Sequence, residues 1–288
     1  MTTLHGELGR RIAAAVDEPD RHTAVPGVVL HAARTPGALT PVLFHPTLYL
    51  VVQGAKRLLL GDREIAYGAG DLVTLSVDLP GLAQVTVASD QVPYLAVEMA
   101  LDREALAALV TQVPTSAREE TGPLRVHPLP PGVLEPTLRL LQLMEDPVDA
   151  RVLAGAATRE VLYRVLRSPA GSSLLQLVRS DSTLARIGHV TAWLHDHLEA
   201  PVAVERLAGR AGMSVTTFHR SFKAATGMTP GQYHKTLRLH EARRLVAVRS
   251  DTLSRIAVAV GYASASQFSR DYKRAFGSAP AHDAKRFG

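Results

Sequence analysis

The 288-residue sequence contains no cysteine. This absence excludes disulfides, thiolate metal sites and cysteine nucleophiles, and it fits a reducing cytoplasm. The sequence also has no run of about 18 uncharged apolar residues, so we expect no membrane-spanning helix. Residues 1–11 are charged and lack the apolar stretch of a secretory signal. We therefore expect a cytoplasmic protein with no membrane association.

Histidines and carboxylates do not form the clusters that metal enzymes need. Two histidines, His31 and His45, lie among the expected strands. That region contains no His-x-His motif followed by a glutamate. A catalytic metal needs two or three histidines and a carboxylate that converge on one ion. Asp78 and Glu98 could be paired carboxylates, but nothing in the sequence orients them. We expect no enzyme activity, no cofactor and no metal.

The positive charge is concentrated in one half of the chain. The net charge is +5, yet residues 181–288 hold 16 Lys/Arg against 8 Asp/Glu, while residues 1–180 hold 16 against 19. A basic half is what a polyanion-binding segment requires, although a solvated basic surface has the same composition.

Short runs rich in Val, Leu, Thr and Tyr dominate the first hundred residues, and turn signals such as Gly54 and Gly61-Asp62 separate them. Regular short strands of this kind predict a β-sandwich or small barrel. The expected strands lie within 28–30, 48–52, 57–60, 72–75, 83–87 and 94–98.

Helical patterns follow the strands. Asp102 is suited to cap a helix that runs to Thr111. Two longer patterns then place apolar residues on one stripe each, and this helix pair is a candidate dimer interface, with ordinary packing on the barrel as the alternative. The stripes are Leu134, Leu138, Leu141 and Met144, and Val152, Ala156, Val161, Leu162 and Leu166. Residues 168–173 are rich in Ser, Pro and Gly and predict the start of a linker.

The last third contains one helix-turn-helix pattern twice. Leu207-Ala208, Gly212, Phe218 and Phe222 of the first copy correspond to Ile256-Ala257, Gly261, Phe268 and Tyr272 of the second. The offset is 49 residues before the turn and 50 after it, so the second turn contains one inserted residue. Two matched units make chance resemblance improbable.

The second helix of each copy carries a polar face beside its buried aromatics. A helix-turn-helix presents such a face to the major groove, where base pairs differ in their hydrogen-bonding groups. The expected DNA-binding residues are Thr216, Thr217, His219, Arg220 and Lys223 in the first copy, and Ser266, Gln267, Ser269, Arg270 and Lys273 in the second.

The segment between the copies predicts a rigid spacer. Thr229-Pro230-Gly231-Gln232 has the form of a capping box with proline at the first helical position. A helix from Pro230 to Val248 would span roughly 25–30 Å. This length approaches the roughly 34 Å between successive major grooves on one side of DNA. We therefore expect two recognition helices in adjacent major grooves of double-stranded DNA.

These residues resemble the AraC/XylS-type transcriptional regulators. The resemblance covers about the last 100 residues and rests on Ala211-Gly212-Met213-Ser214, Phe218 to Lys223, Arg238 with Glu241 to Leu245, Gly261 to Ser264, and Gln267 to Arg270. It implies that Thr216, His219 and Arg220, and likewise Ser266, Ser269 and Arg270, approach bases. Thr216, His219 and Ser266 are side chains of low base specificity, so the sequence does not identify the bases that they would contact.

The front half resembles the same family more loosely. The similarity is to one branch of the family, which has a cupin-like sensing domain. It rests on Leu48 to Asp78 and Arg159 to Gly171, together with Pro280 to Asp283 near the end of the chain. Such domains bind a small effector, dimerise, or both. We expect an α+β protein of two domains: a cupin-like β-barrel or sandwich with flanking helices over 1–167, a linker over 168–182, and an all-α DNA-binding domain over 183–288.

The sequence therefore predicts a sequence-specific DNA-binding transcription regulator, activator or repressor, that is a homodimer and responds to a small-molecule effector. RNA polymerase is an open further partner. Two alternatives remain: a ligand-independent dimeric regulator, and a cupin-type metalloenzyme with an auxiliary helical domain. A cavity inside the strands would favour sensing, and an interior filled with side chains would favour the ligand-independent form.

Overall fold

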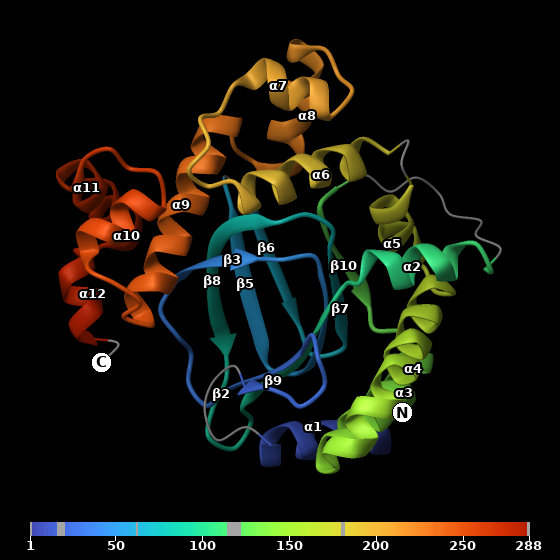
Figure 1. The fold of residues 1–288 in the computed structure, drawn as a ribbon. Helices are drawn as coiled ribbons and strands as arrows, with labels where there is room; N and C mark the ends of the chain where they lie inside the picture. The colour runs from blue at the N-terminus through green and yellow to red at the C-terminus, as the bar shows by residue number, and fades with distance from the viewer. Residues whose placement is uncertain (1, 16–20, 62, 114–121, 180–181, 287–288) are drawn as a thin grey trace.

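The structure is a computed structural model that describes residues 2–15, 21–61, 63–113, 122–179 and 182–286. Its centre is a sandwich of two antiparallel sheets (Figure 1). The six-stranded sheet has the order β1 (Arg21–His22), β2 (Val28–Ala33), β9 (Tyr94–Ala100), β4 (Thr47–Gln53), β7 (Asp71–Leu75), β10 (Leu124–Pro128). The four-stranded sheet has the order β3 (Thr40–Phe44), β8 (Leu79–Val87), β5 (Ala55–Leu60), β6 (Arg63–Gly68).

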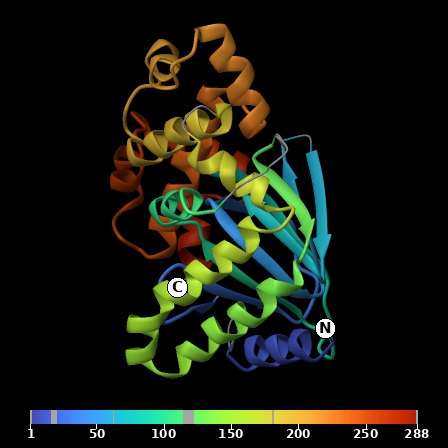
Figure 2. The same ribbon diagram turned by 90° about the vertical axis from the view of Figure 1, so that its right-hand side faces the viewer.

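Helices cover the outer face of the six-stranded sheet. In Figure 2 the blue and yellow-green helices lie beside and below the strands, and the orange helices lie above them. The covering helices are α1 (Thr2–Ala15), α2 (Arg103–Val110), α3 (Pro131–Gln142), α4 (Pro147–Leu166) and α5 (Gly171–Val178), with a 3₁₀ turn at Leu143–Glu145. Asp102 caps α2 as expected, because its carboxylate accepts the backbone N–H groups of Glu104 and Ala105.

Both faces of the six-stranded sheet are buried. On β4, Leu48, Leu50 and Val52 pack toward the covering helices, whereas Tyr49 and Val51 face the other sheet. A strand that is buried on both faces has apolar residues at every position. This explains why residues 48–52 are continuously apolar and do not show the alternation of apolar and polar residues typical of a half-exposed strand. The two resulting cores lie on opposite sides of one sheet.

Four short strands were not expected from the sequence. β10 follows Pro123 and ends at Pro128, yet it pairs antiparallel with β7 at the sheet edge, where proline is tolerated. β1 and β6 also lack the apolar runs of the predicted strands, whereas β3 contains the run Val42-Leu43-Phe44 directly after Pro41. The residues of β3 and β6 are mostly half-buried or exposed in the structure.

The segment expected as a linker contains a buried helix. α5 lies within residues 168–182, and Leu174, Leu175 and Leu177 pack into the core between the six-stranded sheet and its helices. Ser168, Pro169 and Ala170 lie in the turn between α4 and α5, and Gly171, Ser172 and Ser173 form the first turn of α5. The domain boundaries themselves remain a proposal.

The C-terminal part is entirely helical in the described residues. It contains α6 (Thr183–Asp196), α7 (Val204–Arg210), α8 (Val215–Thr226), α9 (Pro230–Ala247), α10 (Leu253–Ala259), α11 (Ala265–Phe276) and α12 (Pro280–Arg286). In Figure 1, α6 to α8 lie across the top of the sandwich and α10 to α12 lie to one side, with α9 between them. No helix among the described residues is long and apolar enough to cross a bilayer.

Candidate nucleic-acid interface

The first helix-turn-helix consists of α7 and α8. Gly212 in the turn has φ +60°, and Gly227 ends α8 with φ +74°, both in the left-handed region that glycine tolerates. Phe218 and Phe222 are fully buried, with ring centroids 5.3 Å apart. These aromatics hold α8 against the protein and leave its opposite face toward solvent.

The exposed face of α8 matches most of the predicted DNA-binding set. Thr216, His219, Arg220 and Lys223 are all exposed. Thr217 is only half-buried: its backbone N–H donates to the Ser214 hydroxyl, which in turn donates to the Thr217 hydroxyl oxygen. Thr217 therefore stabilises the start of the recognition helix in this structure, a role that the helical spacing did not reveal.

The second helix-turn-helix, α10 and α11, repeats this arrangement. Phe268 and Tyr272 are buried, and the Ser264 hydroxyl caps α11 by accepting the Gln267 backbone N–H. Gly277 ends α11 with φ +74°, as Gly227 ends α8. All five predicted residues of this copy are exposed, namely Ser266, Gln267, Ser269, Arg270 and Lys273.

The basic residues on both faces point into solvent. Arg220, Lys223, Arg270 and Lys273 make no ion pair with any residue in the part of the chain that the structure describes. An acidic residue of α11 is instead neutralised internally, since Asp271 is buried and lies 2.7 Å from Lys235 Nζ of α9. Charged donors that are not used within the protein can contact phosphates and guanine edges.

The spacer helix α9 begins as predicted. The Thr229 hydroxyl accepts the Gln232 backbone N–H, the Gln232 side chain accepts the Thr229 backbone N–H, and Pro230 occupies the first turn. At 18 residues the helix is about 27 Å long. Lys235 and Arg243 connect it to the second unit, since Arg243 pairs with the buried Asp283 of α12.

Arg238 of α9 fixes the second unit relative to the first. Its guanidinium donates to the carbonyl oxygens of Leu198, after α6, and Gly261, in the second turn, at 2.5 and 3.2 Å. Burial lowers the pKa of Arg238. A Cβ at Gly261 would lie 2.7 Å from this guanidinium, so glycine is needed there for space as well as for its φ of +81°. The Arg238 guanidinium therefore holds the second turn against the end of α6.

The interior of the sandwich holds a cluster of buried tyrosines. Tyr49 of β4, Tyr67 of β6 and Tyr94 of β9 are each at most 7 % exposed. Burial first, and then the neighbouring Tyr94, raise the pKa values of Tyr49 and Tyr67 well above the ordinary value. The Lys56 ammonium lies 5.3 Å from the Tyr49 ring centroid. The interior is thus occupied by rings that carry polar groups.

The histidines of the sandwich pair with the two carboxylates considered above. His31 Nε2 lies 2.7 Å from the Glu98 carboxylate, and His45 Nδ1 lies 2.7 Å from that of Asp78. The hydrogen bond to Asp78 raises the pKa of His45 against the effect of burial. The two pairs do not converge, and the described residues contain no group of three potential metal ligands.

Asp78 also joins the two parts of the protein. Its backbone carbonyl accepts the hydroxyl proton of Tyr233, a fully buried residue of α9, at 2.8 Å. His195 of α6 lies edge-on to His45, with ring centroids 5.6 Å apart. The contact between Asp78 and Tyr233 spans 155 residues and lies outside any sequence motif, so spacing could not predict it.

One apolar core extends across this junction. It includes Leu58, Val73 and Ala96 of the two sheets together with buried side chains of α6, α8 and α9, among them Ile187, Phe218, Phe222 and Tyr233. The second unit has its own core, which contains Ile256, Phe268 and Tyr272. The first helix-turn-helix is thus packed on the sandwich, whereas the second is not part of that core.

Comparison with known proteins matches both halves. The model of the AraC-type transcriptional regulator N-terminus matches residues 24–173, and a helix-turn-helix domain model matches residues 207–286. The HTH-type transcriptional activator RhaS of Escherichia fergusonii is 35 % identical over 148 residues, which are 51 % of this chain and 52 % of that protein. RhaS of Citrobacter koseri is 32 % identical over 156 residues, or 52 % and 53 %. The chain spans about half the length of these curated relatives.

The fold resembles that of ToxT from Vibrio cholerae. The apo form of a ToxT variant has a TM-score of 0.61 at 11 % identity and covers 94 % of this chain and all of that one. The unsaturated fatty acid bound form of wild-type ToxT has a TM-score of 0.61 at 12 % identity, over 92 % and 96 % of the two chains. At such identities the likeness concerns the fold alone.

Proposed function

The chain belongs to the AraC-type family of transcriptional regulators, and from this premise we propose that it is a sequence-specific DNA-binding transcription regulator. Two recognition helices with exposed basic residues carry the proposal. α8 and α11 would enter adjacent major grooves, since α9 supplies about 27 Å of the roughly 34 Å that separates them. Regulation of transcription would bring the bound protein to RNA polymerase.

The arginines of the two recognition helices provide the direct test. Arg220→Ala and Arg270→Ala are each expected to weaken binding to the operator by about 1–3 kcal/mol, because each removes a charged donor to a guanine edge or a phosphate. Fluorescence anisotropy with DNA from upstream of the protein's own gene, at fixed salt, measures the loss. Unchanged affinity in both variants would argue against the assignment.

A matched control separates local contacts from net charge. Arg34, directly after β2, is exposed and lies outside both recognition helices and α4, so Arg34→Ala removes the same charge without touching the proposed interface. Its affinity for DNA should stay close to that of the wild type. A loss equal to that of Arg220→Ala would mean that overall charge, not α8, determines binding.

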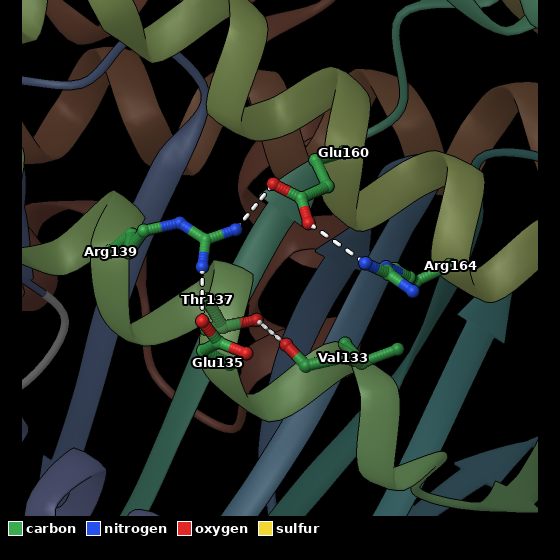
Figure 3. Close-up of polar contacts among 6 residues, drawn as sticks. All are labelled: Val133, Glu135, Thr137, Arg139, Glu160 and Arg164. Carbon is green, nitrogen blue, oxygen red and sulfur yellow. Dashed lines mark hydrogen bonds and ion pairs between the residues drawn. The ribbon is translucent and has the colours of Figure 1, made fainter.

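We further propose that the protein is a homodimer through α4. Val148, Val152 and Leu153 of this helix are 60, 70 and 46 % exposed. Figure 3 shows how the helix is held: Arg139 of α3 pairs with Glu160 of α4, and Glu160 also lies 3.3 Å from Arg164. The same network includes Glu135, and the buried Thr137 hydroxyl donates to the Val133 carbonyl at 2.8 Å. Val161, Leu162 and Leu166 of the predicted stripe are buried in the core, so the large aliphatic side chains that α4 exposes are those of Val148, Val152 and Leu153 in its N-terminal half.

Val152→Glu should dissociate this dimer. A two-fold symmetric interface contains the substituted position once from each subunit, so two carboxylates would lose their water on association. We therefore expect the dimer to be at least about tenfold weaker. Sedimentation velocity measures it, and the circular dichroism spectrum should not change because Val152 is exposed. Val258→Glu in α10, at 69 % exposure, is the matched control and should leave the oligomeric state unaltered. Equal behaviour of the two variants would disprove the interface.

Control by a small-molecule effector is the remaining part of the proposal, with a ligand-independent dimeric regulator as the second candidate. The rings of Tyr49, Tyr67 and Tyr94 are buried in the sandwich interior, and this observation favours the second candidate for that location. A ligand there would have to displace them. The two candidates differ in whether any small molecule changes the affinity for operator DNA.

A further inference from the structure

We propose that Arg210 of α7, which lies over the ring of the only tryptophan in the sequence, binds a DNA phosphate beside the first recognition helix. The site rests on the proposed function, because its ligand is the DNA backbone. The predicted DNA-binding residues all belong to α8 and α11, so Arg210 lies outside that set. The contact would come from the first helix of the unit and not from its recognition helix.

Arg210, Trp193 and His197 form a stack on the first unit. The guanidinium carbon of Arg210 lies 4.5 Å from the Trp193 ring centroid. The Trp193 and His197 rings are themselves stacked, with centroids 4.5 Å apart and planes at 18° to each other. Trp193 is half-buried and packs against the core that α6 shares with the sandwich. An indole fixed in this way attracts the cation above it, so Arg210 is oriented before a ligand arrives.

The stack leaves the donors of Arg210 available. Stacking uses the face of a guanidinium, whereas its five N–H groups lie in the plane and point away from its edges. Arg210 is exposed, and its guanidinium makes no ion pair or hydrogen bond with any residue that the structure describes. Phosphate oxygens accept such N–H groups in pairs, so an oriented guanidinium with unused donors is suited to a phosphate.

A second arginine stands on the same face of α7. Arg206 is one helical turn before Arg210, and both are exposed. Arg206 donates to the Pro201 carbonyl oxygen at 3.4 Å, but no carboxylate among the described residues neutralises it. Two like charges at this spacing destabilise a helix, and a bound polyanion relieves their repulsion.

The second unit shows that the helix-turn-helix fold does not require Arg210. At the offset of 49 residues, Ala259 stands at the position of Arg210, and Arg255 stands at that of Arg206. Arg255 is neutralised locally, since its guanidinium lies 3.5 Å from the Asp251 carboxylate. The same turn and recognition helix form in both units, so the unpaired charge on α7 has a use other than folding.

Arg210 lies close to the start of the recognition helix. α7 ends at Arg210, and a short turn through Gly212 leads to Ser214, whose hydroxyl caps α8. Figure 1 shows α7 above α6, on the side away from the sandwich. A recognition helix enters the major groove with its N-terminal residues, while the first helix crosses the backbone. In this docking the end of α7 comes next to the phosphates that border the groove.

The salt dependence of DNA binding tests the site. Each phosphate contact releases counterions, so the loss of one contact lowers the slope of log K against log salt concentration by about 0.9. Arg210→Gln keeps a planar group over Trp193 and removes the charge. We expect its affinity to fall about tenfold, because it loses a charge-assisted hydrogen bond, and by the same factor on operator DNA and on unrelated DNA of equal length. Fluorescence anisotropy over a salt series measures both quantities.

A matched variant controls for charge. Arg34→Gln removes an exposed charge outside both units and should leave the affinity and the slope at the wild-type values. A slope that is unchanged in Arg210→Gln would overturn the phosphate contact. A loss confined to operator DNA would also overturn it, because the side chain would then contact bases.

The single tryptophan provides an independent measurement. DNA that occupies Arg210 should change the fluorescence emission of Trp193 in the wild type, and this change should be largely lost in Arg210→Gln although α8 and α11 still bind DNA. A purely structural role of the stack predicts the same change of emission in both proteins. If the wild type binds no DNA, the proposed function fails and this site fails with it. If DNA binds but neither the slope nor the emission depends on Arg210, this site alone fails.

Discussion

Phe218→Ala is expected to lower the free energy of unfolding by about 3–5 kcal/mol and to loosen the sandwich together with the first helix-turn-helix. Phe218 is fully buried in the core that α6, α8 and α9 share with both sheets. A cavity there removes contacts from side chains of both parts. Urea denaturation gives the loss, and hydrogen exchange gives its extent: protection should fall in β5 and β8 as well as in α8.

The extent of the loss decides this prediction. Exchange that accelerates only in α7 and α8, with β5 and β8 unchanged, would mean that the sandwich is stable without the first unit. The shared core would then be a contact between two independent parts and not one cooperative structure.

Phe268→Ala is expected to cost a similar amount, about 3–5 kcal/mol, but to act on the second unit alone. Phe268 is the counterpart of Phe218 in the repeat and is 1 % exposed, yet its core contains only side chains from α9 to α12 and the turns between them. Hydrogen exchange should accelerate in α10 to α12 while the sandwich keeps its protection. Affinity for operator DNA should fall sharply, because α11 loses its fixed position.

Comparing the two variants controls for the chemistry, since the same side chain is removed at the same position of the repeat. If Phe268→Ala also loosened the sandwich, the second core would be coupled to the first through α9, and the division into two cores would be incorrect. If neither variant affected DNA binding, the recognition helices themselves would be in question.

Local signals in the sequence predicted the C-terminal part closely. The duplicated apolar spacing, the turn glycines Gly212 and Gly261, and the Thr229–Gln232 capping box each occupy the expected place. These features depend on residues within one or two helical turns of one another, so spacing is sufficient to recognise them. The same reasoning located the main strands of the sandwich and the cap at Asp102.

Contacts between distant segments were beyond such reasoning. The hydrogen bond from Tyr233 to the backbone of Asp78 and the burial of α5 depend on how separate elements dock. β10 and β6 gain their hydrogen bonds from neighbours in the sheet and not from their own composition. The ten predicted DNA-binding residues remain predictions, with Thr217 distinguished from the others by its place in the cap.

The two hydrogen bonds from Arg238 to main-chain oxygens bear on how the DNA sequence preferred by such a protein can change during evolution. Both hydrogen bonds of Arg238 go to main-chain oxygens, those of Leu198 and Gly261. They therefore do not depend on which side chains the recognition helices carry toward DNA. Rewriting those outward residues would alter the preferred bases while the separation of the half-sites stays constant. A few surface substitutions would then be enough for the protein to recognise a different operator sequence of the same length.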